Sequence, residues 1–131
     1  MRKDIDIPEV KDVHIAVIKQ KIENSKASEW IVYVLNNKNE SIDILIIVSH
    51  GHYRKKSTST LRKTINILPK KSFSKLEILP EDLFELHNEY KVSFFQNNKL
   101  YDKTFTFKKG SIRDSNLVAI PLLEEKGILA E

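Results

Sequence analysis

The chain has no cysteine and only three glycines among its 131 residues. Without cysteine it has no disulfides, no thiolate metal ligands and no cysteine nucleophile. The scattered glycines Gly51, Gly110 and Gly127 cannot form a glycine-rich phosphate loop. No apolar run approaches the roughly 18 residues of a membrane span, and Met1–Asp6 contains no hydrophobic signal region. We therefore expect a cytoplasmic protein.

Hydrophobic residues make up 40% of the chain and charged residues 31%, a composition typical of a folded domain. The length suits one domain with its own core. Residues 1–12, which contain Pro8, are expected to form an extended lead-in. We expect the domain itself over residues 13–115 and a tail over residues 116–131 that packs back on it.

Acidic residues are missing from one long segment, between Asp43 and Glu77. The same segment holds eight basic residues: Arg54, Lys55, Lys56, Arg62, Lys63, Lys70, Lys71 and Lys75. The rest of the chain is net acidic, with 14 basic and 18 acidic residues, although the total net charge is +4. Clustered cations attract phosphate backbones or acidic proteins, whereas lysines on edge strands block aggregation between sheets. Both interpretations remain open.

Most of the chain has the residue pattern of β-strands. Aromatic and β-branched runs bounded by turn residues predict strands over residues 13–22, 30–35, 42–48, 61–68, 72–79, 90–96 and 99–108. The first run is apolar on both faces, so we expect both to be covered. Asn97-Asn98 is a candidate two-residue turn, because asparagine tolerates positive φ. Core positions are expected at Trp30, Phe94, Phe105 and Phe107.

Two segments do not follow the strand pattern. Residues 50–60 are polar, basic and rich in Ser and Thr, and we interpret them as a mobile loop. Glu81–His87 follows Pro80 with acids in the first turn and apolar residues at helical spacing, which predicts a helix of about two turns.

The segment Leu86-His87-Asn88-Glu89-Tyr90-Lys91-Val92 resembles the start of the sixth strand in immunoglobulin-like and fibronectin type III domains. In those domains a tyrosine near the strand start hydrogen-bonds back to the upstream backbone. About seven strands with frequent turns agree with this resemblance. The predicted fold class is therefore all-β: an immunoglobulin-like antiparallel β-sandwich of about seven strands, with one short helix before the sixth strand.

Motifs that would carry chemistry are few. His50-Gly51-His52 places two imidazoles on one side of an extended segment. Zinc needs a third or fourth ligand, no acid lies in the basic segment, and His14 and His87 are distant in sequence. We therefore predict no metal site, and Gly51 is interpreted as a bulge or a strand end.

Hydroxyl groups cluster in Ser57-Thr58-Ser59-Thr60, beside Arg54 and Arg62. Such groups can cradle a phosphate or be phosphorylated, and the alternative, which we favour, is a hydrophilic loop. The spacing suggests no Ser–His–Asp set and no nucleophile elbow. We expect no catalytic residue, no cofactor and no enzymatic activity.

A second resemblance concerns four short stretches: residues 4–10, 13–17, 98–105 and 121–123. They resemble a small, uncharacterised bacterial family, some of whose members carry the label phenylalanyl-tRNA synthetase alpha subunit. The resemblance implies no known activity and no catalytic residue. A synthetase of that class needs a large antiparallel sheet and a glycine-rich ATP motif, which 131 residues with three scattered glycines cannot supply.

The sequence favours a non-enzymatic binding domain whose partner is another protein or a second copy of the chain. The alternative is an accessory protein that binds RNA or DNA through the basic segment. Its candidate residues are Tyr53, Arg54, Lys55, Lys56, Arg62, Lys63, Lys70 and Lys71. This alternative requires those basic residues to converge on one face, with Tyr53 exposed.

Overall fold

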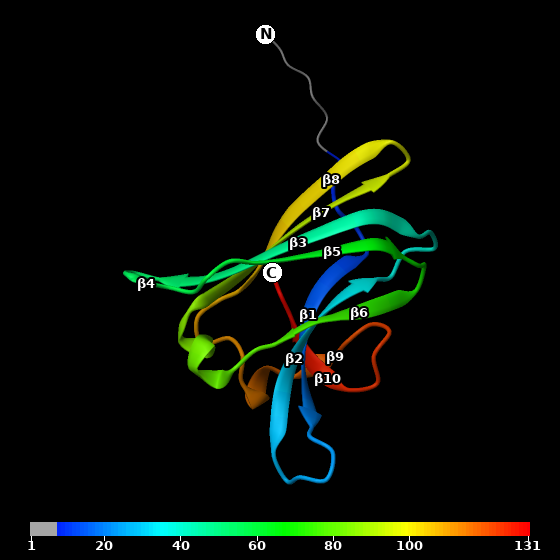
Figure 1. The fold of residues 1–131 in the computed structure, drawn as a ribbon. Helices are drawn as coiled ribbons and strands as arrows, with labels where there is room; N and C mark the ends of the chain where they lie inside the picture. Colours follow the sequence, from blue (N-terminus) through cyan, green and yellow to red (C-terminus); the bar gives the residue numbers. More distant parts are fainter. Residues whose placement is uncertain (1–7) are drawn as a thin grey trace.

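A computed structural model describes residues 8–131, which form two antiparallel β-sheets packed face to face (Figure 1). The predicted all-β sandwich is confirmed. Residues 1–7 of the expected lead-in lie outside the described residues. Residues 8–131 form ten strands where the sequence predicted about seven, because the expected loop and tail contain three short strands.

Sheet A has the strand order β6-β2-β1-β10-β9. Its strands are β1 (Val13–Lys21), β2 (Ser28–Asn36), β6 (Ser72–Ile78), β9 (Val118–Ala119) and β10 (Lys126–Leu129). The tail thus supplies two of the five strands, and β10 pairs directly with β1.

Sheet B has the order β4-β3-β7-β8, and β5 also pairs with β3. Its strands are β3 (Ile42–Tyr53), β4 (Lys56–Ser57), β5 (Leu61–Leu68), β7 (His87–Gln96) and β8 (Lys99–Phe107). The two 3-10 helices are η1 (Glu81–Glu85) and η2 (Asp114–Asn116). Asn97 and Asn98 both have positive φ, 53° and 63°, so the predicted two-residue turn between β7 and β8 is confirmed.

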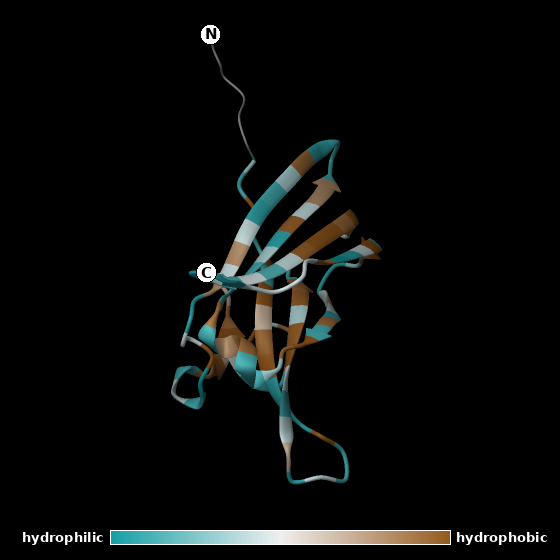
Figure 2. Cartoon of the chain, turned by 60° about the vertical axis from the view of Figure 1, so that its left-hand side comes forward, coloured by the Kyte–Doolittle hydropathy of each residue, from teal (hydrophilic) through white to brown (hydrophobic). Residues whose placement is uncertain are grey.

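The core lies between the sheets and is built from alternate residues of each strand. All four predicted core aromatics are buried: Trp30, Phe94, Phe105 and Phe107. A second, smaller cluster lies on the other side of sheet A, where the tail covers β1. Its buried members are Ala16, Ile18, Leu35 and Ile120. Both faces of β1 are therefore covered, as its pattern predicts, and Figure 2 shows hydrophobic residues through both sheets.

The prediction of a mobile loop over residues 50–60 is wrong for its first half. The strand β3 continues to Tyr53 and returns as β4 after a turn at Arg54, whose φ is 56°. The strand extends this far because β7 provides hydrogen-bonding partners that the local sequence does not reveal. Gly51 pairs with Asn88, and His52 pairs with His87.

The predicted two-turn helix is also shorter than expected. It is a single 3-10 segment, η1, whose amides of Leu83 and Leu86 bond to the carbonyls three residues earlier. His87 already belongs to β7. The chain has only a few residues in which to cross from β6 in one sheet to β7 in the other, and the tighter 3-10 geometry suits so short a connection.

The expectation that the Tyr90 hydroxyl bonds to the upstream backbone is wrong, because the acceptor is a side chain. The Tyr90 hydroxyl donates to Oε2 of Glu77, at 2.7 Å. Glu77 pairs with Val32, a core residue of β2, so its side chain points into the space between the sheets. The tyrosine therefore links the two sheets through a carboxylate.

Candidate binding surfaces

Part of the predicted basic set lies at the tip of the β3–β4 hairpin, which projects from the body at the left of Figure 1. Tyr53 is half-buried. Two cations lie over its ring: the guanidinium carbon of Arg54 is 5.1 Å from the ring centroid, and the Nζ of Lys109 is 4.6 Å from it. Lys55 and Lys56 follow in the turn and in β4. Sequence reasoning missed Lys109, because no local signal connects the end of β8 to Tyr53.

The remaining predicted residues lie elsewhere. Arg62 and Lys63 are neighbours on β5, so their side chains point to opposite faces. The Lys63 ammonium donates to the carbonyl of Lys75 on β6, at 2.7 Å. Lys70 and Lys71 lie beyond the other end of β5, about 26 Å along the strand from its start, given a rise of about 3.3 Å per residue. The Lys71 ammonium is held by the Asn37 carbonyl at 2.8 Å. The structure therefore divides the basic set among three places.

Three histidines and one glutamate meet on the outer face of sheet B. His50 and His52 on β3 pair with Glu89 and His87 on β7. The ring centroids of His50 and His52 are 5.6 Å apart, those of His52 and His87 are 5.8 Å apart, and His52 Nε2 lies 3.2 Å from Glu89 Oε2. His87 is distant from His50 and His52 in the sequence, and only the pairing of β3 with β7 brings these groups together.

These groups do not converge on a common point. Within residues 8–131, no set of three or more His, Asp or Glu side chains is placed to hold a metal ion. His87 Nδ1 also accepts the backbone N–H of Lys109, at 3.0 Å, so that nitrogen is already occupied. The cluster is therefore best described as stacked imidazoles with one carboxylate partner.

The hydroxyl-rich segment is tied to β3 through Thr58. Thr58 Oγ1 accepts the N–H of Gly51 at 2.8 Å and donates to the carbonyl of Ser59 at 3.0 Å. Gly51 lies inside β3 and not at its end, which corrects the strand-end interpretation. A Cβ at Gly51 would lie 2.9 Å from Asn88 Oδ1 and 3.2 Å from Thr58 Cγ2, so a larger residue would have to displace these side chains.

An exposed apolar row crosses the outer face of sheet B near the start of β3. Asp43 pairs with Ile67 on β5 and with Phe95 on β7, and Phe95 pairs with Leu100 on β8. Paired residues point to the same face. The three apolar side chains are 60% (Ile67), 44% (Phe95) and 54% (Leu100) exposed. We call Ile67, Phe95 and Leu100 the apolar row. The sequence alone gives no signal that these three side chains lie near one another, because only the strand pairing places them together.

Ile44 lies beside this row and adopts an unusual backbone conformation. Its φ is 49°, in the left-handed region that β-branched residues rarely enter. The residue lies in the bulge where the β3–β7 register shifts between Asp43 and Ile46. Its side chain is 50% exposed, so the strained conformation presents one more apolar group to solvent.

No protein-family model matches this chain, and a search of curated proteins also found no match. Across residues 8–131, none of the helices is long and apolar enough to cross a membrane.

Proposed function

We propose that the protein is a non-enzymatic binding domain that docks a protein partner on the outer face of sheet B. The observation that carries this proposal is the apolar row. Phe95 and Leu100 are paired on β7 and β8, and Ile67 on β5 lies on the far side of Asp43, which pairs with both Ile67 and Phe95. All three apolar side chains remain about half exposed. Exposed apolar side chains gathered on one face beside charged ones are typical of protein interaction sites.

The surroundings of the row support a protein partner over a small ligand. Lys91 and Asp102 flank it on the same face and lie 3.8 Å apart, which gives the apolar centre a polar rim. The row follows an open sheet surface and not a cavity, and flat apolar surfaces with polar rims suit protein partners.

The test is a double substitution, Phe95→Lys with Leu100→Lys. We expect the wild-type chain to self-associate in sedimentation velocity or to recover a specific protein in affinity purification, and the variant to lose that interaction. The matched control is Val118→Lys, because Val118 on β9 in sheet A is similarly exposed, at 49%. A monomeric wild type that recovers the same proteins as the double variant would refute the proposal.

Binding of RNA or DNA is the second candidate, and the geometry that favours it is limited to the hairpin tip. There Tyr53, Arg54 and Lys109 form a stacked group with Lys55 and Lys56 nearby in the chain. Cations beside an aromatic ring suit a phosphate and a base. Absence of enzymatic activity and a cytoplasmic location stay predictions.

We also propose that the sandwich is immunoglobulin-like. In support, β1 and β2 pair in one sheet, whereas β3, β7 and β8 pair in the other. Immunoglobulin-like domains divide their first and second strands from their third, sixth and seventh in the same way. Here β7 and β8 correspond to the sixth and seventh of the seven predicted strands. Membership of the small bacterial family stays a prediction.

A further inference from the structure

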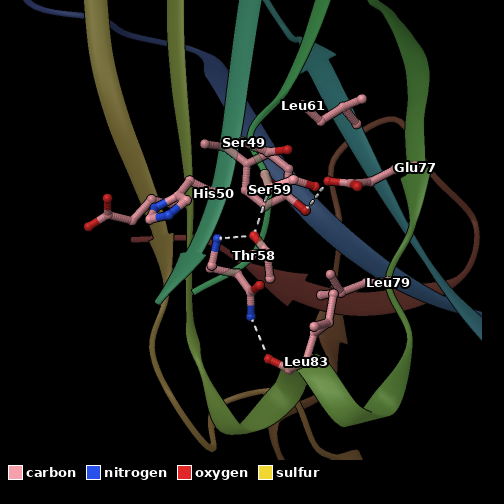
Figure 3. A pocket seen from close by; sticks show the side chains of 12 residues that line it. Ser49, His50, Thr58, Ser59, Leu61, Glu77, Leu79 and Leu83 are labelled. Atoms are coloured by element: carbon pink, nitrogen blue, oxygen red, sulfur yellow. Dashed lines mark hydrogen bonds between the residues drawn. The ribbon is translucent and has the colours of Figure 1, made fainter. Parts of the chain in front are cut away.

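A cavity of about 260 Å³ opens between the two sheets, where the end of β3 faces β6 and η1 (Figure 3). Its polar walls come from Ser49, Glu77 and Tyr90, and its apolar walls from Leu61, Leu79 and Leu83. His50 also borders the cavity, but Figure 3 shows its side chain on the other side of β3. This cavity is separate from the apolar row, because none of Ile67, Phe95 and Leu100 lines it.

The charge of the cavity is negative, in contrast to the basic segment around it. Among the residues that the structure describes, no lysine or arginine lines it. Glu89, the other acid at its border, directs its carboxylate to His52 on the outer face. Glu77 is therefore the ionisable side chain that gives the cavity its charge.

Within the described part of the chain, the Glu77 carboxylate has a neutral partner and no cationic one. The Tyr90 hydroxyl donates to Oε2. Burial raises the pKa of Tyr90, and the Glu77 charge raises it further, so the phenol stays protonated and remains a donor. Among residues 8–131, no Lys or Arg nitrogen lies within ion-pair distance of this carboxylate. The nearby Lys63 is held by the carbonyl of Lys75.

A half-buried carboxylate between leucine walls can gain most from a cation that brings its own apolar surface. The cavity is smaller than the roughly 300–1,000 Å³ typical of sites for drug-sized ligands. Its volume suits a group of side-chain size, with the charge at one end and a short chain along Leu61, Leu79 and Leu83.

We propose that this cavity binds a primary ammonium group on a short aliphatic chain, with Glu77 accepting from the ammonium and the three leucines packing on the chain. A lysine side chain of a partner protein and a free alkyl diamine share this chemistry. Ser49, at the border of the cavity, offers a further acceptor through its hydroxyl.

The test is a chemical-shift titration of the ¹⁵N-labelled full chain with n-pentylamine, and with 1-pentanol as a neutral probe of similar length. We expect saturable shifts at the amides of Ser49, Glu77 and Leu79 with pentylamine, and affinity about tenfold or more weaker for pentanol. Equal affinity for the two probes, or no saturable shift with the amine, would overturn the proposal.

Substitutions at Glu77 and Glu89 test which carboxylate binds the ammonium group. Glu77→Gln keeps an acceptor for Tyr90 and removes the charge, so amine affinity should fall about tenfold. Glu89→Gln is the matched control, because that carboxylate lies on the outer face, and affinity should change less than about twofold. Equal effects of both variants would contradict the assignment. Tyr90→Phe leaves the charge in place and should retain binding, which keeps the test decisive if Glu77→Gln folds poorly.

Two further probes distinguish the sources of the ammonium group. Tighter binding of a lysine blocked at both ends than of 1,5-diaminopentane supports a partner's lysine side chain. The reverse order supports a free diamine. If both bind no better than pentanol, the ammonium proposal is wrong.

Discussion

At the scale of single residues, Ile44 combines an exposed side chain with a left-handed backbone conformation. A non-glycine residue loses roughly 1–2 kcal/mol in this region, whereas asparagine enters it more readily. We predict that Ile44→Asn raises the free energy of unfolding by about 1 kcal/mol and weakens partner binding at the adjacent row.

The measurement for Ile44→Asn is urea denaturation. Ile67→Asn is the control, because Ile67 is also exposed but does not have positive φ. A surface substitution of this kind should change stability by less than about 0.5 kcal/mol. Equal effects of the two variants would show that backbone strain at Ile44 does not limit stability.

We expect His14 on β1 to make the free energy of unfolding depend on pH. Burial lowers the pKa of His14 below its ordinary value of 6.5; Asp12 opposes this shift and Lys103 adds to it. The unfolded chain therefore takes up a proton at a higher pH than the folded chain does. The free energy of unfolding should fall as the pH drops from above 6.5 toward the lower pKa of the folded state.

His14→Gln should flatten this part of the pH profile, because glutamine does not titrate. Urea denaturation of both chains between about pH 5 and pH 8 measures the difference. If the slope for His14→Gln matches the wild-type slope, other groups cause the pH dependence.

At the scale of elements, β8 is an edge strand with an open side. Thr106 turns both its backbone groups away from β7 and exchanges two hydrogen bonds with Glu131, at 2.8 and 3.0 Å. Because backbone direction alternates along an antiparallel strand, Leu100, Asp102 and Thr104 face the same edge. Lys103 instead faces β7, where it pairs with buried Val92.

Proline substitutions test this alternation. Thr104→Pro removes an N–H that faces the open edge and should cost about 1 kcal/mol of stability. Lys103→Pro removes a ladder N–H opposite Val92 and should cost about 3 kcal/mol or more. Thermal unfolding measures both, and Lys103→Ala separates the loss of the Lys103–Phe105 contact from the loss of the N–H. Similar costs for the two prolines would contradict the orientation of β8.

At the scale of the whole molecule, the distribution of cations limits how a polyanion can bind. For single strands, log K falls with log salt with a slope of about −0.7 per phosphate contact. The four cations at the hairpin tip (Arg54, Lys55, Lys56 and Lys109) predict a slope of about −3, whereas all eight basic residues of the segment would give about −6.

Fluorescence anisotropy with mixed-sequence RNA at several salt concentrations measures this slope. We expect a slope near the value of about −3 given by the four cations of the hairpin tip. In the double variant Lys55→Gln/Lys56→Gln the slope should become less negative, because two phosphate contacts are lost. A slope near −6 would mean that the whole segment wraps the nucleic acid. No binding at low salt would leave protection of the β5 and β6 edges as the role of its lysines.

The strands were predictable because their information is local. The observed β5 and β6 closely match the predicted runs over residues 61–68 and 72–79, and the Asn97–Asn98 turn follows from the tolerance of asparagine for positive φ. Local pattern failed at residues 50–53, where polar residues extend β3 because β7 lies beside them.

The amino-acid sequence by itself determined the all-β class, the core aromatics and the double coverage of β1, because side-chain alternation and turn chemistry act over a few residues. Only the tertiary structure decided which surface groups meet. The apolar row joins β5, β7 and β8, the Glu77–Tyr90 pair joins the two sheets, and the basic segment is divided by the length of β5. The reason is that strand register depends on partners distant in the chain, which local pattern does not encode.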